Sequence, residues 1–151
     1  MATTIDVKPE APNVVNLEPN EPIANSVFSG SIGGTGEILI LPIGENIILG
    51  TAVANVNGVA YKYNINNPAH AYALAGIAQT SAVMGQFVVV QPDGLVNVPG
   101  WNLTPGAVYH VGSNGALTSS PDLSTGRILQ TLGKAINSST LLLRPDDPVT
   151  L

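Results

Sequence analysis

Two histidines, His70 and His110, are the side chains of this chain best suited to proton transfer near neutral pH. His110 follows Tyr109 in the apolar run AVYHV, so a strand there would turn only one of the two rings toward a core. A catalytic histidine needs a nucleophile and an acid that orients its ring. The sequence has no G-x-S-x-G motif to present a serine. We therefore interpret both histidines as polar strand or loop residues, one of them at a subunit contact, and predict no metal site because two ligands without nearby carboxylates bind metal poorly.

The acidic side chains also do not form a catalytic pattern. Glycoside hydrolysis needs two carboxylates on one concave face. The body of the chain offers only Glu37, Glu45, Asp93 and Asp122, and Asp93 lies in a Pro-Asp-Gly turn, where aspartate is favoured for backbone reasons. The glycine-rich stretch at 33–36 lacks the Lys-Ser/Thr of a phosphate loop and precedes a strand-like run. These patterns predict a protein that is not an enzyme and carries no cofactor.

Trp101 is the only tryptophan and follows Pro-Gly just before a turn. An indole in such a place can stack against a sugar ring, or it can close the end of a β-core or pack at an interface. Both interpretations stay open. We predict that Trp101, Tyr109 and His110 are subunit or ligand contacts.

The composition indicates that much of the surface is covered. The chain has 151 residues, enough for one domain with a real core, but only 10% are charged, against about 25% in ordinary soluble domains. Low surface charge favours association, so we expect copies of the chain to assemble with each other or within a larger structure. The net charge of −5 belongs to the two ends, which argues against nucleic acid as a partner.

The sequence also limits compartment and membrane association. There is no cysteine, so disulfides and thiolate metal sites are excluded. No run approaches the length of a membrane span, and the first residues lack the apolar run of a secretory signal. We expect a protein made in the cytoplasm that does not bind membranes.

We predict an extended N-terminal arm over residues 1–29, a β-domain over 30–145 and an acidic C-terminal tail over 146–151. Four prolines interrupt any helix or strand ladder in the arm, yet apolar residues recur through it. Such a segment suits an extended strap lying on another surface, although a floppy tail is the alternative. The apolar arm residues predicted to contact that surface are Ile5, Val7, Val14, Val15, Leu17 and Ile23.

The domain reads as a series of short strands separated by turn signals about every 8–12 residues, which is typical of sandwiches and barrels. The alanine-rich window 68–85 lacks a helical stripe, so we predict a strand over 74–79 and at most one helical turn near 68–72. The predicted fold class is all-β, a small antiparallel sandwich or barrel of short strands with an extended N-terminal arm.

The segment NLTPGAVYHVGSNGALTSSP, followed by GRILQTLGKAI and SSTLLLRPDDP, resembles a β-rich module of tailed-phage virion proteins. That module occurs in head-fibre, capsid decoration (cement) and some tail-fibre proteins, and the likeness covers roughly residues 45–145. The matching positions are turn and core residues that carry fold rather than chemistry. They are Leu103, Thr104, Pro105, Gly106, Tyr109, Gly115, Leu117, Thr118, Pro121, Gly133, Ala135 and Leu141.

The resemblance implies a structural protein of the virion, usually a homotrimer. On this hypothesis the chain is a decoration protein on the outer capsid surface, with the major capsid protein and its own copies as partners. The arm would strap onto the capsid protein or a neighbouring copy. The alternative is a head-spike or tail-fibre module that binds a host-surface glycan. A small hydrolase has no motif in its favour.

Overall fold

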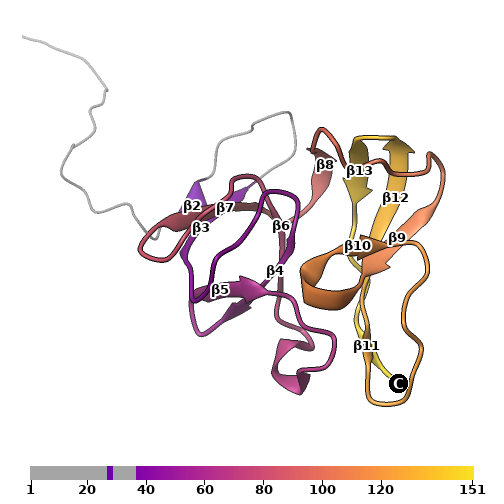
Figure 1. The fold of residues 1–151 in the computed structure, drawn as a ribbon, viewed down its shortest axis with the longest axis horizontal. Helices are drawn as coiled ribbons and strands as arrows, with labels where there is room; N and C mark the ends of the chain where they lie inside the picture. The colour runs from indigo at the N-terminus through magenta and orange to yellow at the C-terminus, as the bar shows by residue number, and fades with distance from the viewer. Residues whose placement is uncertain (1–26, 29–36) are drawn as a thin grey trace, which may run out of the picture.

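The computed structural model of the chain describes residues 27–28 and 37–151 (Figure 1). In this part the chain is all-β, and every pair of neighbouring strands in its sheets is antiparallel. The predicted all-β, antiparallel fold class is thus confirmed, and the predicted N-terminal arm lies outside the described residues. The helical content of the described part consists of two single 3-10 turns, η2 (Pro68–His70) and η3 (Ser113–Gly115), and η2 lies where one helical turn was expected. None of the described helices has the length and apolar character needed to cross a membrane.

The first half of the described chain forms a six-stranded sheet that curls into a small barrel. A parallel bridge between Ile43 and Ala60, with the Gly44 N–H donating to the Ala60 carbonyl at 2.9 Å, joins the end of β3 back to β5. The strands, in the order β2-β3-β7-β6-β4-β5, are β2 (Val27–Phe28), β3 (Ile38–Pro42), β7 (Phe87–Gln91), β6 (Leu74–Ala78), β4 (Ala52–Val56) and β5 (Val59–Lys62).

The second half forms a five-stranded sheet beside the barrel (Figure 1). Its order is β10-β9-β12-β13-β8, with β8 (Gly94–Asn97), β9 (Val108–Val111), β10 (Leu117–Thr118), β12 (Thr131–Asn137) and β13 (Thr140–Leu143). A separate pair joins β11 (Ile128–Leu129) to β14 (Val149–Thr150). Residues 146–151, set apart from the sequence as an acidic tail, therefore return to the domain through β14.

The alternation of side chains along β4 explains how the two halves pack. Ala52 and Ala54 face a core shared with buried residues of the second sheet, including Leu132 and Leu141, while Val53 faces the barrel interior. Because successive residues of a strand point to opposite faces, β4 serves both cores at once. Small alanines on the shared face let the two sheets approach closely, so the halves form one packed unit.

The segment 102–121 contains a β-hairpin. β9 and β10 pair antiparallel, with Leu117 opposite Val111, and the Gly112 N–H donates to the Ala116 carbonyl at 2.6 Å across the turn. Tyr109 is buried and His110 is half-buried on the opposite face of the strand. The alternation expected for this strand therefore turns Tyr109 toward the core.

Candidate functional site

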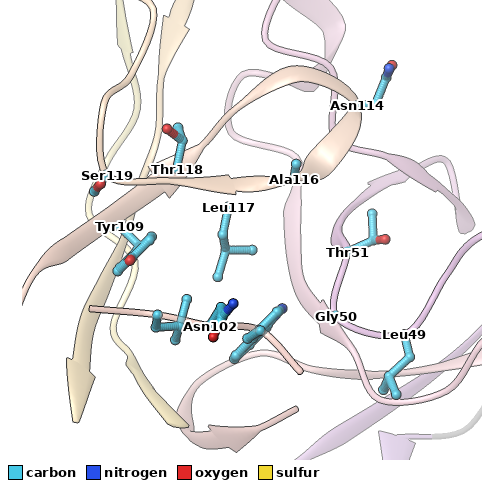
Figure 2. A pocket seen from close by; sticks show the side chains of 12 residues that line it. Leu49, Gly50, Thr51, Asn102, Tyr109, Asn114, Ala116, Leu117, Thr118 and Ser119 are labelled. Carbon is cyan, nitrogen blue, oxygen red and sulfur yellow. The ribbon is translucent and has the colours of Figure 1, made fainter. Parts of the chain in front are cut away.

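A pocket of about 520 Å³ lies where the barrel meets the β9–β10 hairpin. The barrel contributes the turn before β4, at Leu49, Gly50 and Thr51, and the second half contributes Trp101, Asn102 and the hairpin. Figure 2 shows the Leu117 side chain projecting into the space toward Asn102. No lining residue carries a charge, so the pocket offers amide and hydroxyl groups beside aromatic and aliphatic carbon.

Trp101 is held in this pocket by Gly50. A Cβ atom added to Gly50 would lie 2.7 Å from Nε1 of Trp101 and 3.2 Å from Cγ1 of Val98. Gly50 also has a φ of +88°, which side chains rarely adopt. One edge of the indole therefore packs directly against the backbone at Gly50, and Trp101 remains partly exposed. We call this contact the Gly50 seat of Trp101.

Tyr109 lines the same pocket. Its side chain is 7% exposed, and its hydroxyl accepts a hydrogen bond from the Thr104 N–H at 2.8 Å. That bond ties the Thr-Pro-Gly turn to strand β9. Trp101 and Tyr109, two of the three residues singled out from the sequence, thus share one site.

His110 is not part of this pocket. It lies on the other face of β9, where Nδ1 is 3.0 Å from the Thr131 hydroxyl of the neighbouring strand. Burial lowers the pKa of His110 below its ordinary value. The contact is a polar pair between side chains of neighbouring strands.

His70 ends the 3-10 turn η2, and its side chain is hydrogen-bonded to the backbone. It is 6% exposed, and its Nδ1 accepts the Asn64 N–H at 2.9 Å while its ring packs edge-on against Tyr63 at 5.7 Å. Burial lowers the pKa of His70, and the charge of Glu45 opposes that shift. Within residues 37–151 no group of three or more His, Cys, Asp or Glu side chains could hold a metal ion.

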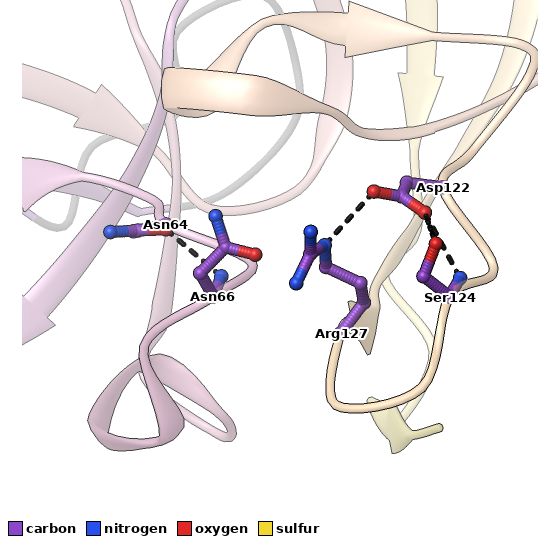
Figure 3. Close-up of polar contacts among 5 residues, drawn as sticks. All are labelled: Asn64, Asn66, Asp122, Ser124 and Arg127. Carbon is purple, nitrogen blue, oxygen red and sulfur yellow. Dashed lines mark hydrogen bonds and ion pairs between the residues drawn. The ribbon is translucent and has the colours of Figure 1, made fainter.

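Asp122 forms a structural turn. Its carboxylate accepts hydrogen bonds from the Ser124 backbone N–H at 2.9 Å, the Ser124 hydroxyl at 2.6 Å and Arg127 Nε at 2.9 Å (Figure 3). The Ser124 bonds, followed by Arg127, lower the pKa of Asp122 to about 2. The loop then returns to the barrel, where the Ile128 N–H donates to the Ile65 carbonyl at 2.9 Å. An acid held ionised in this way cannot donate a proton near neutral pH.

An exposed apolar surface lies next to the pocket, on two loops of the barrel. Ile47 and Ala82 exchange backbone hydrogen bonds, so the loops run antiparallel as a rigid pair. Two further bonds pin them, from the Leu49 N–H to Ser81 Oγ and from the Met84 N–H to Asn46 Oδ1, each at 2.9 Å. We call the apolar side chains on this pair the apolar ledge: Ile48 (70% exposed), Leu49 (39%), Val83 (54%) and Met84 (61%).

Charged residues are scarce around the apolar ledge. No Asp, Glu, Lys or Arg occurs in 46–61 or in 63–92, and the charged residue nearest to the ledge in sequence is Glu45, which pairs with Lys62. Contiguous exposed apolar surface on a rigid scaffold is typical of interaction sites. Sequence reasoning missed this surface, although the run Ile47-Ile48-Leu49 before a glycine was a usable signal, because three consecutive apolar residues cannot all face a core from one strand.

The predicted contact residues of the arm lie outside the described residues. They are Ile5, Val7, Val14, Val15, Leu17 and Ile23.

Comparisons with protein-family models, with curated proteins and with solved structures found no match to this chain. The likeness to phage virion modules therefore stays a prediction.

Proposed function

We propose that this chain is a non-enzymatic structural protein of a tailed-phage virion, a decoration protein that binds the outer surface of the head. The observation that carries the proposal is the apolar ledge, which leaves four large apolar side chains exposed to water on two loops that are bonded to each other. Apolar side chains exposed to water do not stabilise a free monomer. Binding to a capsid would bury these side chains, and their removal from water would favour the bound state.

The positions that carry the resemblance support the proposal by their place in the fold. Leu103, Ala135 and Leu141 are buried in the core shared by the two sheets, and Gly115 closes the hairpin turn against the backbone of Ala52. These four residues therefore have structural roles, which is what the resemblance implies for them.

The proposed partners are the major capsid protein and further copies of this chain, in a trimer. A protein that binds the assembled shell and not its separated subunits stabilises the shell by linkage. Three weak contacts held in one trimer bind far more tightly than each does alone. The mass of the purified protein by light scattering tests the trimer, and a monomer at working concentration contradicts it.

A sedimentation assay with empty heads that lack this protein tests the function. We expect the full chain to co-sediment with the heads and to raise their melting temperature. Met84→Asp should weaken binding at least tenfold because it buries a charge in the contact. Leu123→Asp is the matched control, since Leu123 is 64% exposed on the loop between β10 and β11 and is not one of the apolar ledge residues. Failure of the full chain to bind any head preparation contradicts the proposal. If Met84→Asp and Leu123→Asp lose binding affinity equally, the apolar ledge is not the contact surface.

The arm is tested in the same assay with the full chain. Replacing its six apolar contact residues by serine keeps the length and charge of the arm. Reduced binding supports the strap, and binding at full strength contradicts it.

The alternative function, a head-spike or tail-fibre module that binds a host glycan, is favoured by one specific observation. The pocket brings Trp101 together with amide and hydroxyl groups and contains no charge. Adsorption of the pure protein to host cells, and inhibition of phage adsorption by it, test this alternative.

A further inference from the structure

We propose that the pocket between the barrel and the β9–β10 hairpin binds a neutral pyranose sugar, the terminal ring of an uncharged surface glycan. This inference rests on the alternative function above and names its ligand class and its residues. The size of the pocket, about 520 Å³, falls within the usual range of small-ligand sites, about 300–1,000 Å³.

The absence of charge in the lining selects the ligand class. A phosphate, sulfate or carboxylate group entering the pocket would lose water without meeting a cation. A neutral sugar has a smaller desolvation cost than a charged one, and its hydroxyls exchange hydrogen bonds to water for hydrogen bonds to amide and hydroxyl groups of the pocket. Sialylated and phosphorylated glycans are therefore expected to bind poorly.

The polar groups of the pocket have hydrogen-bonding capacity to spare. Several asparagines elsewhere bond to nearby backbone or side chains, as Asn55 does with the Gly58 N–H and Asn97 with Thr140. The side chains of Asn102 and Thr51 make no such bond to any residue in the described part of the chain. Figure 2 shows Asn102 below Leu117. An amide has two donors and an acceptor, which suits the paired hydroxyls of a sugar.

The carbon surfaces of the pocket complete the match. A pyranose ring has a face of C–H bonds that packs against an aromatic ring, because the negative face of the ring attracts their partial positive charge. Trp101 is held by its seat on Gly50 and stays partly exposed, so this surface is already in place before a ligand arrives. Leu117, which projects into the space, supplies a second apolar contact (Figure 2).

The backbone at Asn102 permits a clean test. Its φ is +60°, a conformation that glycine adopts without strain, so Asn102→Gly removes the amide while keeping the turn. Asn57→Gly is the matched control, because Asn57 has a φ of +55° in the exposed β4–β5 turn and does not line the pocket. Trp101 is the only tryptophan, so its fluorescence reports on the pocket directly.

The experiment titrates the full chain with methyl glycosides of neutral hexoses and with sialylated and phosphorylated sugars, while Trp101 emission is recorded. We expect saturable changes with a neutral glycoside only, an affinity about tenfold weaker in Asn102→Gly, which corresponds to about 1.4 kcal/mol, and no change in Asn57→Gly. Stronger binding of the charged sugars overturns the inference.

Binding of the full chain, Asn102→Gly and Asn57→Gly to a glycan array distinguishes a wrong pocket assignment from a wrong glycan function. If the chain binds glycans and Asn102→Gly binds equally well, the glycan function stands and the assignment to this pocket is wrong. If no glycan binds and no sugar changes Trp101 emission, the inference and the glycan function fail together.

Discussion

Replacing Gly50 with alanine should damage both the stability of the fold and the seat of Trp101. The added Cβ would lie 2.7 Å from Nε1 of Trp101, whereas such atoms rest about 3.5 Å or more apart, so the indole must move by about 0.8 Å. Overpacking of this kind costs about 1–3 kcal/mol. The positive φ of +88° adds about 1–2 kcal/mol for any side chain, partly offset by the lower entropy of the unfolded chain. We expect a total loss of about 2–4 kcal/mol.

Gly58→Ala is a control that measures the cost of the backbone strain without the contact to Trp101. Gly58 has a φ of +85°, close to that of Gly50, but an added Cβ would meet no atom within 4 Å. Its cost should be about 1 kcal/mol, the strain alone. Urea unfolding of both variants, followed by circular dichroism, gives the difference, and Trp101 emission should shift to the red in Gly50→Ala only. Equal losses and equal spectra in the two variants would refute the proposed seat.

Three further predictions concern buried polar groups. Tyr63 is fully buried and its hydroxyl has no partner among the described residues, so Tyr63→Phe should stabilise the fold by about 1 kcal/mol in urea unfolding; a loss of stability would mean that the hydroxyl is satisfied. Tyr109→Phe removes the acceptor of the Thr104 N–H and should destabilise by about 1 kcal/mol, so a neutral result would count against that bond. Since burial lowers the pKa of His70 below 6.5, stability should be complete above pH 6.5 and decrease as the pH falls toward the lower folded pKa. The urea midpoint should drop between pH 7 and pH 5, less so in His70→Gln, and a flat profile would contradict the role of Nδ1 as acceptor.

The fold class was predictable because its signals are local. Turn residues such as Asn57-Gly58 and Pro92-Asp93-Gly94 end strands wherever they occur, and Asn57-Gly58 does form the turn between β4 and β5. Strand β6 also begins at Leu74 as expected, since apolar residues without a helical stripe favour a strand.

Boundaries that depend on tertiary contacts were not predictable. The run GRILQTLGKAI, residues 126–136, indicated one long strand, but the structure divides it at Gln130 into β11 and β12. The buried amide of Gln130 donates to the Thr131 and Asp146 carbonyls at 3.1 and 2.8 Å, and nothing in the local sequence reveals that role for a polar side chain.

The candidate site was half predictable. Trp101 and Tyr109 stood out by residue type, and both line the pocket. Gly50 and Thr51 lie far from them in sequence and reach the pocket only because the barrel packs against the hairpin. The apolar ledge likewise arises from two loops about 35 residues apart, which the backbone bonds between Ile47 and Ala82 bring together.

A cryo-electron-microscopy map of the virion that carries this chain tests the central proposal most directly. We predict trimeric density on the outside of the head into which residues 37–151 fit, with the apolar ledge buried against the shell or a neighbouring copy. Density for the chain in the tail fibre alone, or heads whose outer surface lacks it, would contradict its assignment as a decoration protein.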